Sequence, residues 1–115
     1  MPNPRQHLGA FGEGVAARWY VARGYTVVDR NWRVRGGEID LIVQLGCQLV
    51  FCEVKTRTRD TFGTGLDAVT WSKQQRLRKL ASAWLAVHPS ADYRAIRFDV
   101  ASIVGGAIQV VEAAF

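Results

Sequence analysis

The segment GGEIDLIVQLGCQLVFCEVKTR, residues 36–57, decides the fold of this chain. Apolar and β-branched residues dominate residues 38–45 and 49–57, which predicts two β-strands. Gly46 and Cys47 connect them, and a glycine at the first central position of a two-residue loop favours a hairpin turn of type II′. This turn sets the register of the hairpin, which starts with Leu45 facing Gln48.

Four charged residues of the hairpin fall on one face of the predicted sheet. The register places Asp40 opposite Glu53 and Glu38 opposite Lys55, and side chains alternate between the two faces along each strand. The opposite face is predicted to be apolar and to consist of Ile39, Leu41, Val43, Val50, Cys52 and Val54.

Asp40 and Glu53 form the candidate chemical site. Two carboxylates that face each other across a hairpin destabilise it by about 0.2–1 kcal/mol unless a cation compensates them. Mg²⁺ suits this pair, because it prefers oxygen ligands and binds through one or two carboxylates together with water and a substrate phosphate. Lys55 is placed to orient or deprotonate an attacking water, or to stabilise charge that develops on the phosphate.

A plainer interpretation of the same residues is open. Glu38 and Lys55 can form an exposed ion pair while Asp40 and Glu53 are solvated, as is common on one-sided sheets. Phe51 argues against it, because this apolar residue shares the face of the charges and indicates a covered surface.

The flanking segments predict an α/β fold, a sandwich around a central mixed sheet flanked by helices. A first helix is expected from about Leu8 to Arg23 and a strand from Tyr25 to Arg33. Later strands are expected from Arg94 to Val104, with Asp99 on the outward face, and from Ala107 to Val111. The apolar face of the first helix is predicted to consist of Phe11, Val15, Ala16, Trp19 and Tyr20.

The second helix has two candidate starts and one clear end. Both Thr64–Asp67 and Ser72–Gln75 resemble capping boxes, and His88–Pro89 ends the helix. Lys73 interrupts the apolar stripe, so its head group either reaches an acid or phosphate at the site or extends to solvent. The stripe consists of Leu66, Val69, Lys73, Leu77, Leu80 and Trp84.

Length and charge bound the possibilities further. A chain of 115 residues is predicted to form one domain, residues 1–115, and its net charge of +5 with a pI near 9.8 favours an anionic partner such as nucleic acid. No signal peptide or membrane-spanning run is recognisable, so a cytoplasmic location is expected. Cys47 and Cys52 lack further ligands at metal-binding spacing and are interpreted as reduced thiols.

Five sequence motifs carry a family resemblance. They are Gly12–Glu13, RNWR at 30–33, GEIDLI at 37–42, VFCEVKTR at 50–57, and Ala68–Val69 followed by Lys73, Arg76 and Leu77. In this order they resemble the YraN family of bacterial proteins, over nearly the whole chain. That family is similar to the restriction-endonuclease-like PD-(D/E)XK superfamily, near the archaeal Holliday-junction resolvases.

The resemblance implies an αβββαβ core and a magnesium-dependent endonuclease that acts on DNA, including branched or junction DNA, with Mn²⁺ as a substitute ion. Asp40 corresponds to the first acid of the motif, Glu53 to the second and Lys55 to its lysine. Glu13 matches an acid that related resolvases place on the first helix, as a further catalytic residue and metal ligand. Ile39 replaces the proline of the motif name. Related resolvases are homodimers, which makes a homodimer an expectation here.

Four basic residues are candidate DNA contacts: Arg57, Arg59, Lys73 and Arg76. Arg57 and Arg59 follow the candidate site, where arginine forks suit phosphate oxygens, although an ordinary surface loop is the alternative. Arg76 belongs to a charge run that is either a DNA contact or a solvated helix face. Trp71 lies off the helical stripe and is the one tryptophan considered for a DNA contact.

Two functions that involve nucleic acid are compatible with these observations, and a scaffold that binds no nucleic acid is a third. The first is an endonuclease, which the simultaneous presence of Asp40, Glu53 and Lys55 favours. The alternative is a nucleic-acid-binding module of nuclease fold with little or no hydrolytic activity. In both cases the basic charge predicts binding that weakens steeply as salt increases.

Overall fold

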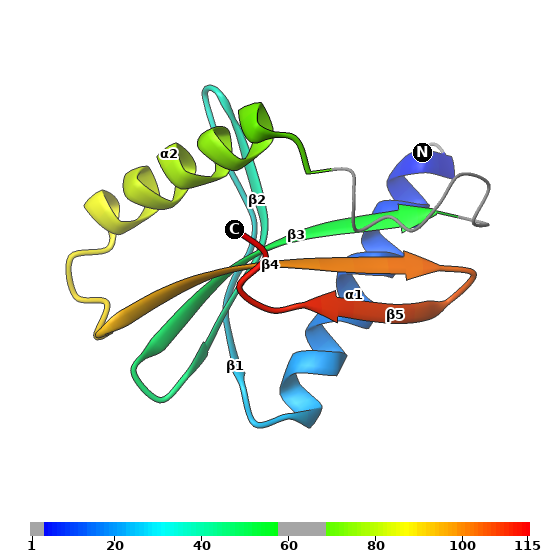
Figure 1. The fold of residues 1–115 in the computed structure, drawn as a ribbon, viewed down its shortest axis with the longest axis horizontal. Coiled ribbons are helices and arrows are strands. Elements are labelled where there is room, and N and C mark those ends of the chain that lie inside the picture. The colour runs from blue at the N-terminus through cyan, green and yellow to red at the C-terminus, as the bar shows by residue number, and fades with distance from the viewer. Residues whose placement is uncertain (1–3, 58–68) are drawn as a thin grey trace.

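The computed structural model describes the backbone of residues 4–57 and 69–115, and the side chains from residue 8 onward in these ranges (Figure 1). The elements are, in chain order, α1 (Pro4–Ala22), β1 (Thr26–Val34), β2 (Gly37–Leu45), β3 (Gln48–Arg57), α2 (Trp71–Val87), β4 (Ala95–Val104) and β5 (Ala107–Val111). Their order agrees with the predicted αβββαβ core.

One mixed sheet organises these elements. The strand order is β1-β2-β3-β4-β5, in which β3 and β4 are parallel and every other neighbouring pair is antiparallel. Parallel strands need a crossover connection, and α2 is part of it. Each helix covers its own apolar cluster, so the middle of the sheet is buried on both faces. The predicted α/β fold is confirmed.

The β2–β3 hairpin has the predicted register from its turn as far as Leu41. Leu45 pairs with Gln48 and Leu41 pairs with Cys52. Gly46 has a φ of +58°, whereas Cys47 is not among the described non-glycine residues with positive φ. A positive φ at the first central position of the turn, but not at the second, is the pattern of the predicted type II′ turn.

The two faces of the hairpin agree with the prediction except at Ile39. Leu41, Val43, Val50 and Cys52 pack in the cluster under α1, as expected. Strand alternation predicts Ile39 beside them, but this residue packs under α2. Regular alternation is lost at this level, because the paired register with β3 has already ended and Asn31 of β1 adopts a left-handed φ of +51°.

The ends of the helices differ in part from the sequence prediction. Helix α1 begins at Pro4, and Phe11 is half exposed rather than on its buried face. Helix α2 begins after Thr70, whose Oγ1 accepts a hydrogen bond from the backbone N of Lys73. The predicted box at Ser72–Gln75 is therefore wrong, and the one at Thr64–Asp67 lies outside the described residues. The end at His88 is confirmed.

Asp99 is buried, although the strand pattern predicts it on an outward face. Its carboxylate accepts hydrogen bonds from the Tyr20 hydroxyl at 2.6 Å, from Nε and Nη2 of Arg97 at 2.8 Å each, and from the backbone N of Ala113 at 3.0 Å. Arg97 also donates to Tyr25 and Gln48. We call these residues the Asp99 network. The prediction failed because α1 covers this face of β4.

Neither described helix is long and apolar enough to cross a bilayer.

Candidate active site at a fork in the sheet

The sheet divides at Asp40. The β2–β3 register ends at Leu41–Cys52, whereas β2 continues beside β1 to Gly37, and β3 continues beside β4 to Arg57. Asp40 does not form the predicted ladder pair with Glu53. Its Oδ2 instead accepts a hydrogen bond from the backbone N of Val54 at 2.8 Å. Figure 1 shows β1 and β2 turning away from β3 and β4 beyond this point.

A cavity of about 300 Å³ opens between the strands of the fork and α2. We call it the acidic cleft; its lining residues are Gly37, Glu38, Asp40, Glu53, Lys73, Arg76, Leu77 and Leu80. The acids come from β2 and β3, and the bases come from the first turns of α2. Asp40 is only 9% exposed and Glu53 is half-buried, whereas Lys73 and Arg76 are more accessible at the mouth. The cleft thus has an acidic floor and a basic rim.

The pKa of the Asp40 carboxyl is raised to about 7, first by burial and then by the charge of Glu53. The hydrogen bond from Val54 opposes this shift, and Glu13 and Glu38 add to it. Asp40 therefore exchanges its proton near neutral pH when no cation is bound. A cation beside it would favour the ionised form.

Glu53 lies between the acids and the bases of the site. Burial raises its pKa, whereas the nearby charges of Lys55 and Lys73 lower it. Lys55 follows on β3 and is half-buried, at the level of Ser102 on β4. The structure thus brings Asp40 and Glu53 into one cleft, and Lys55 lies close enough to Glu53 to lower its pKa without lining the cleft.

Glu13 approaches the site from α1. Burial raises the pKa of its carboxyl, and a hydrogen bond from the Asn31 side chain lowers it. Gly12 allows the approach, since a Cβ at this position would overlap the side chain of Thr56 on β3. Asn31 is a site residue that the sequence analysis missed. The available signal was an asparagine within a strand, because asparagine tolerates a left-handed φ better than most residues.

Glu38 is paired differently from the prediction. Its Oε2 lies 2.8 Å from Nε of Arg33, and the two residues face each other across β1 and β2. The β2–β3 ladder runs from the turn only as far as Leu41, three residues short of Glu38. Glu38 therefore does not face Lys55 as predicted. The Glu38–Arg33 pair is largely exposed, so it contributes little to stability.

The predicted DNA contacts are divided between two places. Lys73 and Arg76 line the acidic cleft. Arg57 ends β3, where its backbone O accepts a hydrogen bond from the backbone N of Gly105, and its side chain is not among those that line the cleft. Arg59 lies outside the described residues.

The donor atoms of the cleft fit a hard divalent cation through two carboxylates. Asp40 and Glu53 offer oxygen ligands, and burial and then the charge of Glu53 raise the pKa of Asp40. Among the described residues, no group of three His, Cys, Asp or Glu side chains is placed to hold a metal ion, and the role of Glu13 as a further ligand stays a prediction. Mg²⁺ tolerates such a set, because water and phosphate oxygens commonly complete its shell.

The candidate site lies within the part of the chain that is similar to known proteins. The model of a family described as "Uncharacterised protein family UPF0102" matches residues 12–103, which include Glu13, Asp40, Glu53 and Lys55. A UPF0102 protein from Frankia casuarinae is 55% identical over 81% of this chain and 78% of its own. One from Kineococcus radiotolerans is 49% identical, over 84% and 79% of the two chains. One from Acidothermus cellulolyticus is 43% identical, over 96% and 95%. The chain therefore belongs to the UPF0102 family, the YraN family that its motifs resemble.

Proposed function

We propose that this protein is a magnesium-dependent endonuclease that hydrolyses DNA phosphodiesters in the acidic cleft. The observation that carries the proposal is the acidic floor below a basic rim in one cavity. A cation fits the floor and a phosphate fits the rim, and metal-assisted phosphodiester hydrolysis requires both in contact. The element order and the positions of Asp40, Glu53 and Lys55 support membership of the PD-(D/E)XK superfamily.

Five residues have a role in this proposal: Asp40, Glu53, Lys73 and Arg76, which line the cleft, and Lys55, which follows Glu53 on β3. Mg²⁺ held by Asp40 and Glu53 would neutralise phosphate charge and make the attacking water more acidic. Lys55 donates a hydrogen bond through Nζ to that water or to a non-bridging phosphate oxygen, which stabilises charge in the transition state. Lys73 and Arg76 bind the phosphates of the strand at the mouth of the cleft.

One observation favours a second candidate function. Among the described residues, no group of three His, Cys, Asp or Glu side chains is placed to hold a metal ion. A nucleic-acid-binding module that keeps the fold but hydrolyses little would need no such group. The two candidates differ in turnover rather than in DNA affinity.

The test compares Asp40→Ala, Glu53→Ala and Lys55→Met by calorimetric Mn²⁺ titration and by cleavage of linear, flapped and four-way DNA. Loss of either acid should reduce both metal affinity and cleavage, because a ligand is removed. Lys55→Met should keep metal affinity and slow cleavage by about 10²–10³-fold, because only a transition-state contact is lost. Arg94→Met, on an exposed residue outside the cleft, is the control.

The outcomes separate the candidates. A Lys55→Met variant that cleaves as fast as the parent would show that this lysine is not catalytic. Salt-dependent DNA binding without cleavage in Mg²⁺ or Mn²⁺ would overturn the nuclease and establish the binding module.

A further inference from the structure

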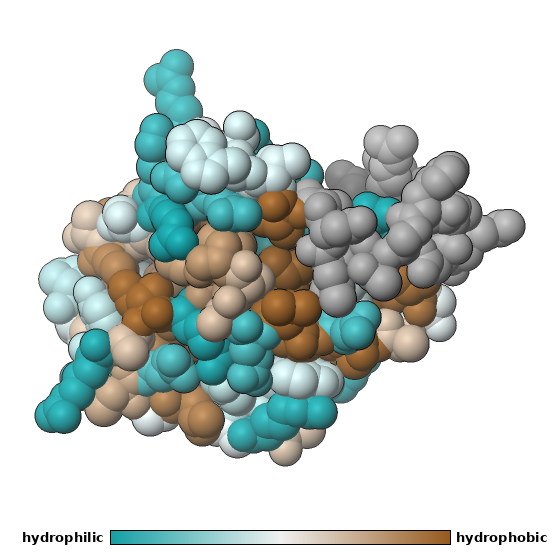
Figure 2. Space-filling model, in the orientation of Figure 1, coloured by the Kyte–Doolittle hydropathy of each residue, from teal (hydrophilic) through white to brown (hydrophobic). Residues whose placement is uncertain are grey.

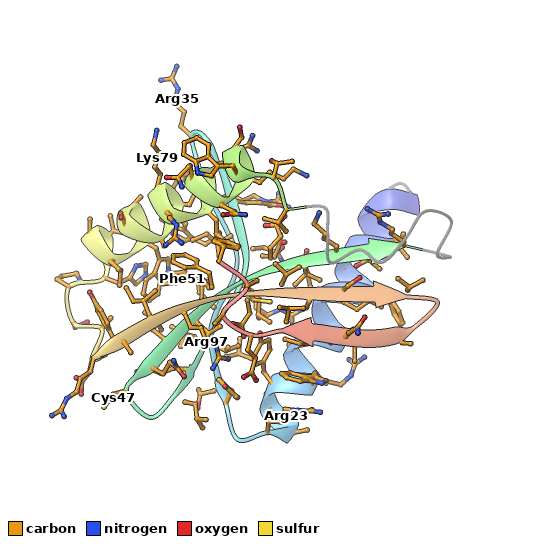
Figure 3. The ribbon with its side chains drawn as sticks, in the orientation of Figure 1. Arg23, Arg35, Cys47, Phe51, Lys79 and Arg97 are labelled. Atoms are coloured by element: carbon orange, nitrogen blue, oxygen red, sulfur yellow. The ribbon has the colours of Figure 1, made fainter. Side chains whose placement is uncertain are left out.

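The outer surface of α2 is strongly basic. Residues 71–87 contain four cations, Lys73, Arg76, Arg78 and Lys79, and no acid. The β1–β2 hairpin adds Arg35 beside this helix, since a Cβ on Gly37 would lie 3.2 Å from Leu80 and 3.6 Å from Arg76. Figure 3 shows Arg35 and Lys79 at the same edge of the molecule, both pointing away from the sheet. In Figure 2 this edge is largely hydrophilic.

Trp71 is exposed on this basic surface, unlike the other tryptophans of the chain. Trp71 is 72% exposed, more than any other large apolar residue of the described chain. The other tryptophans are buried or packed against the two core clusters. Trp71 is the first residue of α2, two residues before Lys73, which lines the acidic cleft. An exposed indole therefore lies within one helical turn of Lys73, on a different side of the helix.

The chemistry of an exposed indole beside cations matches one class of ligand. A nucleobase offers a flat face on which an aromatic ring can stack, and its backbone offers phosphates for the neighbouring cations. In a duplex, both faces of an internal base are already stacked on its neighbours. An unpaired base, unlike an internal base of a duplex, has a face available to Trp71.

We propose that Trp71 is a stacking platform for an unpaired base, and that the preferred substrate carries a single-stranded segment beside the cleaved phosphate. This inference rests on the proposed nuclease function for the position of the cut. Lys73 and Arg76 hold the phosphate at the cleft, and Trp71 holds the base that follows on the same strand. Arg35 and Lys79 bind the backbone beyond it.

Arg78 is not part of this platform. Its guanidinium carbon lies 4.9 Å from the centre of the Phe98 ring and 5.4 Å from that of Phe115, so it packs over an aromatic pair between α2 and the C-terminus. The cations that we assign to the DNA strand are therefore Arg35, Lys73, Arg76 and Lys79.

The test measures binding with divalent metal chelated, so that hydrolysis plays no part. Fluorescence anisotropy compares single-stranded, flapped and fully duplex oligonucleotides of equal length. Trp71→Ala should weaken binding to the first two about tenfold and change duplex binding less than about twofold. Trp71→Phe should keep most of the preference, because a phenyl ring also stacks. Lys79→Gln should weaken all three alike and reduce the salt dependence.

The controls and the outcomes that would contradict this proposal do not depend on whether the protein cleaves DNA. Val87→Ala removes an exposed apolar side chain at the opposite end of α2 and should leave all affinities unchanged. Thermal melting should be unaffected by Trp71→Ala, since the Thr70 cap is retained. Equal losses on duplex and flapped DNA, or no loss, would overturn the proposal. Failure of catalysis would appear as binding preference without cleavage in Mg²⁺.

Discussion

Two buried aspartates of this protein have opposite surroundings. Asp99 accepts four hydrogen bonds, from Tyr20, Arg97 and Ala113, and is inaccessible to solvent. Asp40 accepts a hydrogen bond from Val54, and its pKa is raised by burial and by the charges of Glu53, Glu13 and Glu38. The first carboxylate is compensated within the chain. The second is not, and a buried acid whose pKa is raised by neighbouring acids is typical of candidate binding sites.

The two surroundings follow from two places in one sheet. Asp99 lies on β4 where the strands are fully paired and α1 covers them, and Asp40 lies where β2 leaves β3. Cys52 lies near both: burial raises the pKa of its thiol first, and the charges of Asp99 and Asp40 raise it further. The carboxylate that is compensated within the chain and the one that is not thus act on the same buried thiol.

Asp99→Asn should be the most damaging test of this comparison. The change keeps the shape but leaves the Arg97 guanidinium buried beside a neutral amide, and an amide N–H₂ faces donors. We expect a loss of about 3–5 kcal/mol in the free energy of unfolding, measured by urea denaturation. A loss below about 1 kcal/mol would mean that Asp99 is not the anchor described here.

Asp40→Asn is the same chemical change at the other aspartate. Without metal, it should increase the free energy of unfolding rather than decrease it. A pKa raised from 3.8 to about 7 contributes stability that is fully present below the unfolded value of 3.8 and is lost as the pH rises through about 7. The parent should therefore be weaker at pH 8 than at pH 5. At pH 8 the free energy of unfolding of the variant should exceed that of the parent by an amount on the order of 2–4 kcal/mol. At low pH the two proteins should be equally stable.

The readout for Asp40→Asn is thermal unfolding at pH 5 and pH 8, in chelator and in excess Mg²⁺. The carbonyl oxygen of the introduced amide can still accept the hydrogen bond from the backbone N of Val54, so the comparison isolates the charge. Mg²⁺ should raise the melting temperature of the parent and leave that of the variant unchanged. A variant less stable than the parent at pH 8 in chelator would contradict the interpretation of Asp40 as an uncompensated charge.

Much of the site could be predicted from the hairpin alone. Gly46 and Cys47 define a turn type, the turn sets the register as far as Leu41–Cys52, and Asp40 and Glu53 follow directly beyond that pair. These steps use only neighbouring residues. Their success reflects the strong local rules that connect turn type to strand pairing.

What could not be predicted depends on contacts between distant segments. The fork at Asp40 replaces a ladder pair by a side-chain bond to Val54, and strand alternation contains no information about where two strands separate. Asp99 alternates as an outward residue should, but α1 covers it, and its partner Tyr20 is 79 residues away in the sequence. Asn31 of the candidate site has a positive φ, and the neighbouring residues in the sequence do not specify this backbone angle.

Tyr20→Phe is the mildest test, and it asks whether the two regions act independently. The variant removes one of the four hydrogen bonds to Asp99 and keeps the ring, which packs edge-on against Trp19 and Tyr25. We expect a loss of about 1.5 kcal/mol in urea denaturation, the lower end for a bond to a charged group. Because packing still holds α1 in place, Mn²⁺ affinity should stay within about twofold of the parent. A double-mutant cycle with Asp40→Asn should then give a coupling energy below about 0.5 kcal/mol, as for independent sites. Coupling well above about 1 kcal/mol, or a clear fall in Mn²⁺ affinity, would show that the Asp99 network positions the acidic cleft as well as stabilising the fold.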